Sequence, residues 1–143
     1  MQKAAEDQGG EIDSLTIRRL FDEHYLAVPE GWQLENYDLH RGDSGVSARV
    51  VAGGREFSGV AQGVLEAVVQ AVSAHTGAAI EIGEYNEFAV EGGTHASALA
   101  CIRADIDGRS FSAASLGEDT SSAMLQALLS VVGQFEQAAR QAA

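Results

Sequence analysis

Few side chains in this sequence have both the chemical type and the spacing that catalysis or metal binding requires. The four histidines, His24, His40, His75 and His95, are scattered, and none stands at the short separations typical of zinc ligands. Cys101 is the only cysteine, so the chain has no intramolecular disulfide and no thiolate cluster for a metal. It lies in an alternating run, which favours a small buried side chain over a nucleophile. We therefore expect neither a metal site nor a cofactor.

A tyrosine between two glutamates, Glu84-Tyr85-x-Glu87, is the nearest approach to a catalytic group. Two carboxylates could act as an acid and a base. Three residues apart on a predicted strand, however, Glu84 and Glu87 point to opposite faces, which favours surface or loop carboxylates. Tyr85 either belongs to the core or closes a ligand pocket. Glu66 is either a carboxylate favoured by the dipole at a helix start or a contact for a cationic ligand group.

The composition is that of one globular domain with a strongly acidic balance. The chain has 143 residues, of which 45% are hydrophobic and only 6% aromatic, enough for a single core of Ala, Val, Leu and Ile. A net charge of -12 argues against nucleic acid and against an anionic membrane surface as partners. No apolar run approaches the ~20 residues of a membrane span, and residues 1–10 lack the apolar segment of a signal peptide. We therefore expect a cytoplasmic protein.

Two stretches repeat the same order of turns and strands, and this duplication organises the chain. Gly54-Arg55-x-Phe57-Ser58 and Gly108-Arg109-x-Phe111-Ser112 carry the same letters at matching places. In each stretch a tyrosine precedes a glycine-containing turn, an alternating strand, a Gly-Gly or Asp-Gly turn and a second alternating strand. A helical apolar pattern follows each time. Because the two serines occupy equivalent places, a structural role for both is favoured over catalysis at one.

The predicted elements follow from this repeat. In the first unit we expect strands over 32–39, 46–51 and 55–60, then a helix from Gly63 with Gly77 as its C-terminal cap. In the second unit we expect a strand that begins at Ile80, strands over 96–105 and 109–115, and a final helix capped by Asp119, Thr120 or Ser121. The predicted buried side of that helix consists of Met124, Leu125, Leu128, Leu129, Val132 and Phe135.

These elements predict an α+β domain of duplicated βββα units, in which an antiparallel sheet carries helices on one side. The repeats span about 29–78 and 79–143 and together form one regulatory or dimerisation domain. Residues 1–11 are expected to be a linker remnant, and a short one-sided helix over 12–28 ends before Pro29. That helix needs the domain or a second chain to lie on.

Several motifs in order resemble the C-terminal regulatory domain of α-isopropylmalate synthase, which also occurs in citramalate synthases, and most of all its actinobacterial type. The likeness covers nearly the whole chain, with residues 2–11 and 21–26 similar to the linker that joins the catalytic barrel to that domain. Its motifs are Glu84-Tyr85-x-Glu87-x-Ala89 with Gly92 and Ala96-x-Ala98-x-Ala100, Ser58-Gly59 with Gly63 and Leu65, and Ala123-x-Leu125 with Ala127.

The resemblance implies a leucine-feedback domain that forms a homodimer, with a leucine site between the two halves near the dimer interface. A branched side chain requires a small apolar pocket, and an amino-acid carboxylate requires free backbone N–H groups such as those of a helix start. Carried over by position, the ligand-lining candidates are Gly63, Leu65, Glu66, Tyr85, Ala89, Ala96, Ala98 and Leu116.

This sequence departs from the family pattern around the expected site. Glu66 replaces a pocket alanine, Val64 replaces a proline, and Ala113 and Ser115 stand where the family has glycines. The metal-binding barrel of the full-length enzyme, an acyltransferase, has no counterpart in these residues. We therefore expect either an excised non-catalytic domain or a regulatory half encoded alone. The alternative is a free-standing homologue, used as partner subunit of a separate barrel synthase or as a small enzyme in a specialised biosynthetic pathway.

Overall fold

Two successive units of three strands and one helix make up the described part of the chain. The computed structural model describes residues 11–12, 29, 31–90 and 98–142. The first unit contains β2 (Leu34–Gly42), β3 (Gly45–Ala52), β4 (Arg55–Ala61) and α3 (Val64–Thr76). The second contains β5 (Ile80–Val90), β6 (Ala98–Ile106), β7 (Arg109–Gly117) and α4 (Thr120–Ala142). The predicted α+β fold of duplicated βββα units is confirmed.

The strands form two sheets, whereas the sequence suggested one. β2, β3 and β4 pair antiparallel in the first sheet, and β5, β6 and β7 pair antiparallel in the second. A short strand that the sequence did not predict, β1 (Glu11–Ile12), runs parallel to β5, with Glu11 opposite Ala89 and Ile12 opposite Val90. Apart from Ile12, the predicted helix over 12–28 lies outside the described residues.

The same two-residue turn closes the second hairpin of each unit. Gly53 and Gly54 have φ values of 58° and 78°, and Asp107 and Gly108 have φ values of 51° and 85°. Positive φ at both central positions is the type I′ geometry, whose twist matches that of the paired strands and which favours Gly, Asn and Asp. The repeated letters therefore specify the turn, and through it the register of the strands on either side.

A bulge in the first strand of each unit is a second shared feature. The pairing register shifts at Glu35 in β2 and at Gly83 in β5. An extra residue of this kind bends a strand and changes the direction of the side chains that follow it. Tyr37 and Tyr85 each lie two residues beyond their bulge, so they occupy equivalent positions in the two units.

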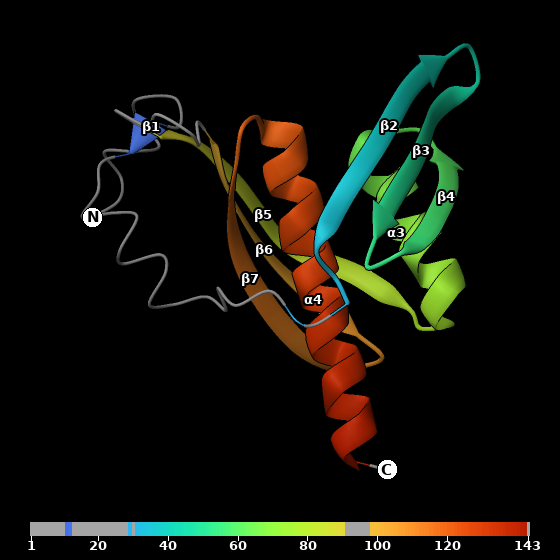
Figure 1. The fold of residues 1–143 in the computed structure, drawn as a ribbon, viewed down its shortest axis with the longest axis vertical. Helices are drawn as coiled ribbons and strands as arrows, with labels where there is room; N and C mark the ends of the chain where they lie inside the picture. Colours follow the sequence, from blue (N-terminus) through green and yellow to red (C-terminus); the bar gives the residue numbers. More distant parts are fainter. Residues whose placement is uncertain (1–10, 13–28, 30, 91–97, 143) are drawn as a thin grey trace.

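Helix α4 runs through the centre of the molecule, between the second sheet and the first unit (Figure 1). The Gln126 side chain ties it to the segment before β2, because it donates to the Trp32 carbonyl at 3.0 Å and accepts from the Leu34 N–H at 2.8 Å. Of the predicted apolar face, Phe135 is half-buried and the others are buried, but Ala127, Ser130 and Val131 are buried as well. None of the described helices, α4 included, is long and apolar enough to cross a membrane.

Helix α3 covers β3 and β4 and approaches β4 very closely. Its buried face is built from Ala67, Val68, Ala71 and Val72. A Cβ added at Gly59 of β4 would lie only 2.4 Å from the Ala67 carbonyl oxygen, so a glycine is needed at this crossing.

The C-terminal cap predicted at Gly77 is confirmed. Gly77 has a φ of 73°, in the left-handed region, and its N–H donates to the Ser73 carbonyl at 2.8 Å.

A glutamine from each helix occupies the outer edge of the last strand in its unit. The Gln70 side-chain oxygen accepts from the Val60 N–H at 2.8 Å, and the Gln134 amide donates to the Ser112 carbonyl at 2.8 Å. Backbone groups that already have a partner are less available for pairing with a further strand. The outer edges of β4 and β7 are thus partly closed to another chain.

Candidate functional site

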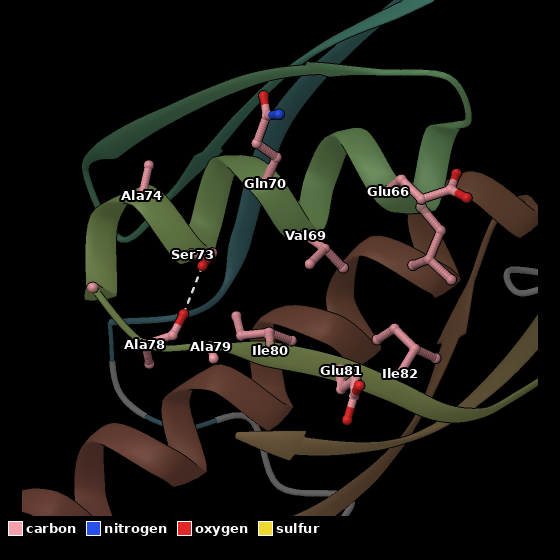
Figure 2. A pocket seen from close by; sticks show the side chains of 12 residues that line it. Glu66, Val69, Gln70, Ser73, Ala74, Ala78, Ala79, Ile80, Glu81 and Ile82 are labelled. Carbon is pink, nitrogen blue, oxygen red and sulfur yellow. Dashed lines mark hydrogen bonds between the residues drawn. The ribbon is translucent and has the colours of Figure 1, made fainter. Parts of the chain in front are cut away.

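The predicted site region is the seam between the two units, where a groove of about 950 Å³ lies between α3 and the start of β5 (Figure 2). Leu65 and Val69 line it from α3, and Ile80 and Ile82 line it from β5. Figure 2 shows Val69 facing Ile80 and Ile82 across the groove. All four side chains are only partly buried, although they pack against the edge of the core. The groove therefore offers apolar surface that the described residues of one chain do not cover.

Two smaller cavities continue from the groove along the seam. One of about 220 Å³ lies at the N-terminal ends of both helices and is lined by Val64, Leu65, Tyr85, Glu87, Thr120, Ser121 and Met124. The other, of about 420 Å³, is lined by Glu87, Phe88, Ala89, Ala98, Glu118, Asp119 and Thr120. The groove shares Leu65 with the first of these cavities, which shares Glu87 and Thr120 with the second, so the three spaces adjoin.

Five of the eight site residues predicted from the sequence line these three spaces. Leu65 and Tyr85 meet at the helix-end cavity, Glu66 lines the groove, and Ala89 and Ala98 line the third cavity. Gly63 is the N-cap of α3 and adjoins Glu66. Leu116 is 42% exposed on β7, opposite Leu99, and Ala96 lies outside the described residues. The other residues that line the helix-end cavity, Val64, Glu87, Thr120, Ser121 and Met124, were not among the predicted site residues. Three of these, Thr120, Ser121 and Met124, share a place at the start of the last helix.

The N-terminus of α3 is left without a side-chain cap. Gly63 is the N-cap residue and has an extended backbone, with φ of -125° and ψ of 167°. The Glu66 carboxylate folds back over it, because a Cβ added at Gly63 would lie 2.1 Å from a Glu66 carboxylate oxygen. The Glu66 side chain is exposed and makes no hydrogen bond or ion pair within the described residues. A negative charge there is favoured by the helix dipole, and it takes the place at which an anionic ligand would bind.

The N-terminus of α4, by contrast, is capped by its own residues. The Asp119 carboxylate accepts from the Ser122 N–H at 2.8 Å, and the Ser122 hydroxyl accepts from the Asp119 N–H at 3.3 Å. The hydrogen bond from the Ser122 N–H is the main reason that the pKa of Asp119 is lowered. This is the reciprocal arrangement of a capping box. The helix start predicted at Asp119, Thr120 or Ser121 is thereby confirmed.

The equivalent tyrosines Tyr37 and Tyr85 both donate their hydroxyls to carboxylates. Tyr37 reaches from the first unit to both Asp119 oxygens, at 3.4 Å each, and Tyr85 donates to Glu87 on the same strand. Burial raises the pKa of Tyr85, and the hydrogen bond and charge of Glu87 raise it further. Burial also raises the pKa of Tyr37, with Asp119 and Glu118 adding to it. Both hydroxyls therefore stay protonated near neutral pH.

The lining of the three spaces is acidic and apolar. Among the described residues, the charged side chains that line these spaces are all carboxylates, Glu66, Glu81, Glu87, Glu118 and Asp119, with no Lys, Arg or His. Such a lining favours a ligand with a cationic group and an aliphatic body.

Among the described residues, no three His, Cys, Asp or Glu side chains lie close enough to hold a metal ion. Glu84, the other half of the suspected acid–base pair, pairs with Arg103 at 3.5 Å instead. Cys101 is buried, as predicted.

Comparison with known families gives one match that spans most of the chain. The LeuA allosteric (dimerisation) domain matches residues 11–136.

Curated relatives that match the chain include 2-isopropylmalate synthases. That of Alcanivorax borkumensis is 35% identical over 146 aligned positions, which cover 99% of this chain and 26% of that protein. That of Mycobacterium leprae is 28% identical over 139 positions, covering 92% of this chain and 23% of that protein. That of Thermobifida fusca is 28% identical over 141 positions, covering 96% and 25% respectively. The chain thus spans about a quarter of the length of these relatives.

Proposed function

The chain belongs to the LeuA allosteric (dimerisation) domain family, and from that premise we propose that it is a non-catalytic module that pairs with a second copy and binds a small amine-bearing molecule at the seam between its units. A ligand that prefers one arrangement of the units or copies shifts the population towards that arrangement. Leucine, the ligand that the resemblance implies, is the first molecule to test.

The observation that carries this proposal is the cavity of about 220 Å³ at the head of both helices. Val64 and Leu65 reach it from the first unit, and Tyr85 and Met124 reach it from the second. A molecule bound there would touch both units and so could alter how they sit against each other. Sites for drug-sized ligands measure roughly 300–1,000 Å³, so this smaller cavity suits a molecule of amino-acid size.

The charges around the seam decide which part of an amino acid is recognised. Glu66 and Glu87 can accept hydrogen bonds from an ammonium group, whereas Glu66 repels a carboxylate at the start of α3. The ligand would therefore be held by its amine and its branched aliphatic body. We expect 3-methylbutylamine, which is leucine without its carboxylate, to bind at least as tightly as leucine. We expect 4-methylpentanoate, which has no amine, not to bind.

The surface that pairs with a second copy is, in this proposal, the groove between α3 and β5. Leu65, Val69, Ile80 and Ile82 place apolar surface there, and the outer edges of β4 and β7 are occupied by glutamines. In a twofold dimer the same patch occurs on both copies, so an apolar patch can cover its own counterpart.

Calorimetric titration of the purified chain tests the ligand. L-leucine, 3-methylbutylamine and 4-methylpentanoate are titrated in turn into the chain and into Glu66→Gln, which keeps the size of the side chain and removes its charge. We expect heat from the two amines, weaker amine binding to the variant, and a smaller loss for leucine, whose carboxylate gains from the change. The absence of heat from all three would leave pairing as the only function of the module.

Sedimentation analysis tests the pairing surface. Val69→Glu introduces a charge into the groove and is expected to shift the chain from dimer to monomer. Ser58→Glu adds the same charge to an exposed position of β4 that points away from α3, and it should leave the dimer intact. A monomeric parent chain, or a dimer that tolerates Val69→Glu, would refute this placement.

A further inference from the structure

The chain enters the two-unit body through a tightly held joint formed by Pro29, Gly31 and Trp32. A Cβ added at Gly53 would lie 1.9 Å from the Gly31 carbonyl oxygen, and one added at Gly133 of α4 would lie 2.7 Å from Pro29. The joint is therefore clamped between a hairpin turn of the first unit and the long helix of the second. A change in the relative position of the two units would therefore alter the contacts of this segment.

Trp32 is the centre of this joint and is only 2% exposed. Its ring stacks on Phe57 at a centroid distance of 5.6 Å, and the Arg55 guanidinium lies over it at 4.4 Å. Its ring N–H donates to the Glu136 carboxylate at 3.2 Å. Arg55 also donates to the Gly31 carbonyl at 2.8 Å. One unit thus supplies the cation over the ring and the other supplies the anion at its edge.

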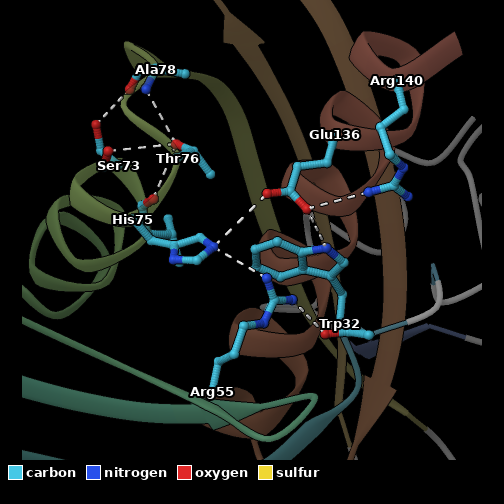
Figure 3. A network of polar contacts seen from close by, with 10 residues as sticks. Trp32, Arg55, Ser73, His75, Thr76, Ala78, Glu136 and Arg140 are labelled. Carbon is cyan, nitrogen blue, oxygen red and sulfur yellow. Dashed lines mark hydrogen bonds and ion pairs between the residues drawn. The ribbon is translucent and has the colours of Figure 1, made fainter.

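His75 lies between that cation and that anion (Figure 3). Its Nε2 is 3.1 Å from Arg55 Nη1 and 3.9 Å from a Glu136 carboxylate oxygen. A guanidinium can only donate, so in this arrangement Nε2 is the acceptor and the imidazole is neutral, with its proton on Nδ1. Once protonated, Nε2 becomes a donor, faces Arg55 as a like charge and has Glu136 as its acceptor.

We propose that protonation of His75 changes its partner at the joint. Neutral His75 accepts a hydrogen bond from Arg55 of the first unit, and protonated His75 donates to Glu136 of the second unit. Each described charge around it has a stated effect. Arg55 opposes the added proton, while Glu136 and the C-terminal end of α3 favour it. Arg140, 4.0 Å from the other Glu136 oxygen, competes for that carboxylate.

Protonation of His75 would weaken the contacts that Arg55 makes with Trp32 and Gly31. When His75 no longer accepts its hydrogen bond, the guanidinium loses one of the two polar partners that it has among the described residues and is repelled by the new charge. It then shields the Trp32 ring less, and the joint loosens on the side of the first unit. This inference involves no ligand, so its test is independent of the function proposed above.

Tryptophan fluorescence tests the inference directly, because Trp32 is the only tryptophan in the chain. The full chain is titrated from about pH 8 to about pH 5.5, the range in which histidines change charge, while circular dichroism confirms that it stays folded. We expect the emission maximum to shift to longer wavelength on acidification. His75→Gln keeps an acceptor for Arg55 but cannot be protonated, so its emission should not change with pH. His40→Gln, at an exposed position of β2, should behave like the parent. An emission that ignores pH in the parent, or the same shift in His75→Gln, would overturn the proposal.

Discussion

The close crossing of α3 over β4 predicts that a methyl group added at Gly59 would destabilise the fold. In Gly59→Ala the new methyl carbon would lie 2.4 Å from the Ala67 carbonyl oxygen and 2.8 Å from the Ala71 nitrogen. Both are backbone atoms of α3, so the helix and the strand must separate by more than half an ångström to reach 3.0 Å. Overpacking of this kind costs about 1–3 kcal/mol. The smaller freedom of alanine in the unfolded chain offsets about 0.4–1 kcal/mol.

We therefore expect Gly59→Ala to lower the free energy of unfolding by about 1–2 kcal/mol. Urea denaturation at one fixed protein concentration measures it, because pairing of copies makes the apparent stability depend on concentration. Gly83→Ala is the matched control: Gly83 is also a strand glycine, but its added Cβ would meet nothing closer than 3.5 Å. Its stability should stay within a few tenths of a kcal/mol of the parent or rise slightly. Equal stability of the two variants would refute the close crossing, and with it the position of α3 as a wall of the groove.

Three further perturbations test other parts of the structure. Asp119→Ala removes the cap that binds the Ser122 N–H, and urea denaturation should show a loss of about 1 kcal/mol. The pKa of Tyr85 is raised above the unfolded value of 10.0, so the stability from its protonated hydroxyl is complete below that pH and is lost as pH rises above it. Tyr85→Phe should accordingly flatten the fall in unfolding free energy above about pH 10. Trp32→Ala empties a buried site and removes the hydrogen bond to Glu136, and thermal unfolding followed by circular dichroism should show a loss of about 3–5 kcal/mol.

The repeated letters predicted the local structure well because they act locally. A Gly-Gly or Asp-Gly pair specifies a type I′ turn wherever it stands, and the turn fixes the register of the strands beside it. Arg55 and Arg109 each lie over the ring two residues further on, at 5.7 Å and 5.5 Å from Phe57 and Phe111. The repeated arginine thus has a structural role of the same kind in both units.

The division into two sheets could not be predicted in the same way. Alternation tells which strands are half-buried but not which strands become neighbours, since pairing between distant strands depends on the whole fold. The burial of α4 shows the same gap. Its apolar stripe correctly predicted one buried face, yet Ser130 and Val131 are buried too, because the first unit covers the side of the helix that the second sheet leaves open.

The candidate site was predicted as a set of positions rather than as one cavity. Leu65 and Tyr85 do meet, but Ala89 and Ala98 lie in the neighbouring space and Leu116 is exposed on β7. Distances between residues far apart in the sequence are set by how the units pack, which a position-by-position resemblance does not encode. The positions carried over by resemblance therefore fall on both units, and the packing of the two helix starts decides which of them share a cavity.

The N-termini of α3 and α4 are capped differently, although the strands that precede them are similar in the two units. Asp119 uses its carboxylate on the N–H of its own helix, so little of its hydrogen-bonding capacity is left for a ligand. Glu66 lies at the equivalent end of the other helix, folded over a glycine cap, with no such bond among the described residues. A carboxylate that its own helix does not use is the one that can receive a cation. If the seam binds an amine, specificity should therefore follow Glu66 and be indifferent to Asp119, whose loss would weaken the helix without changing which ligand is preferred.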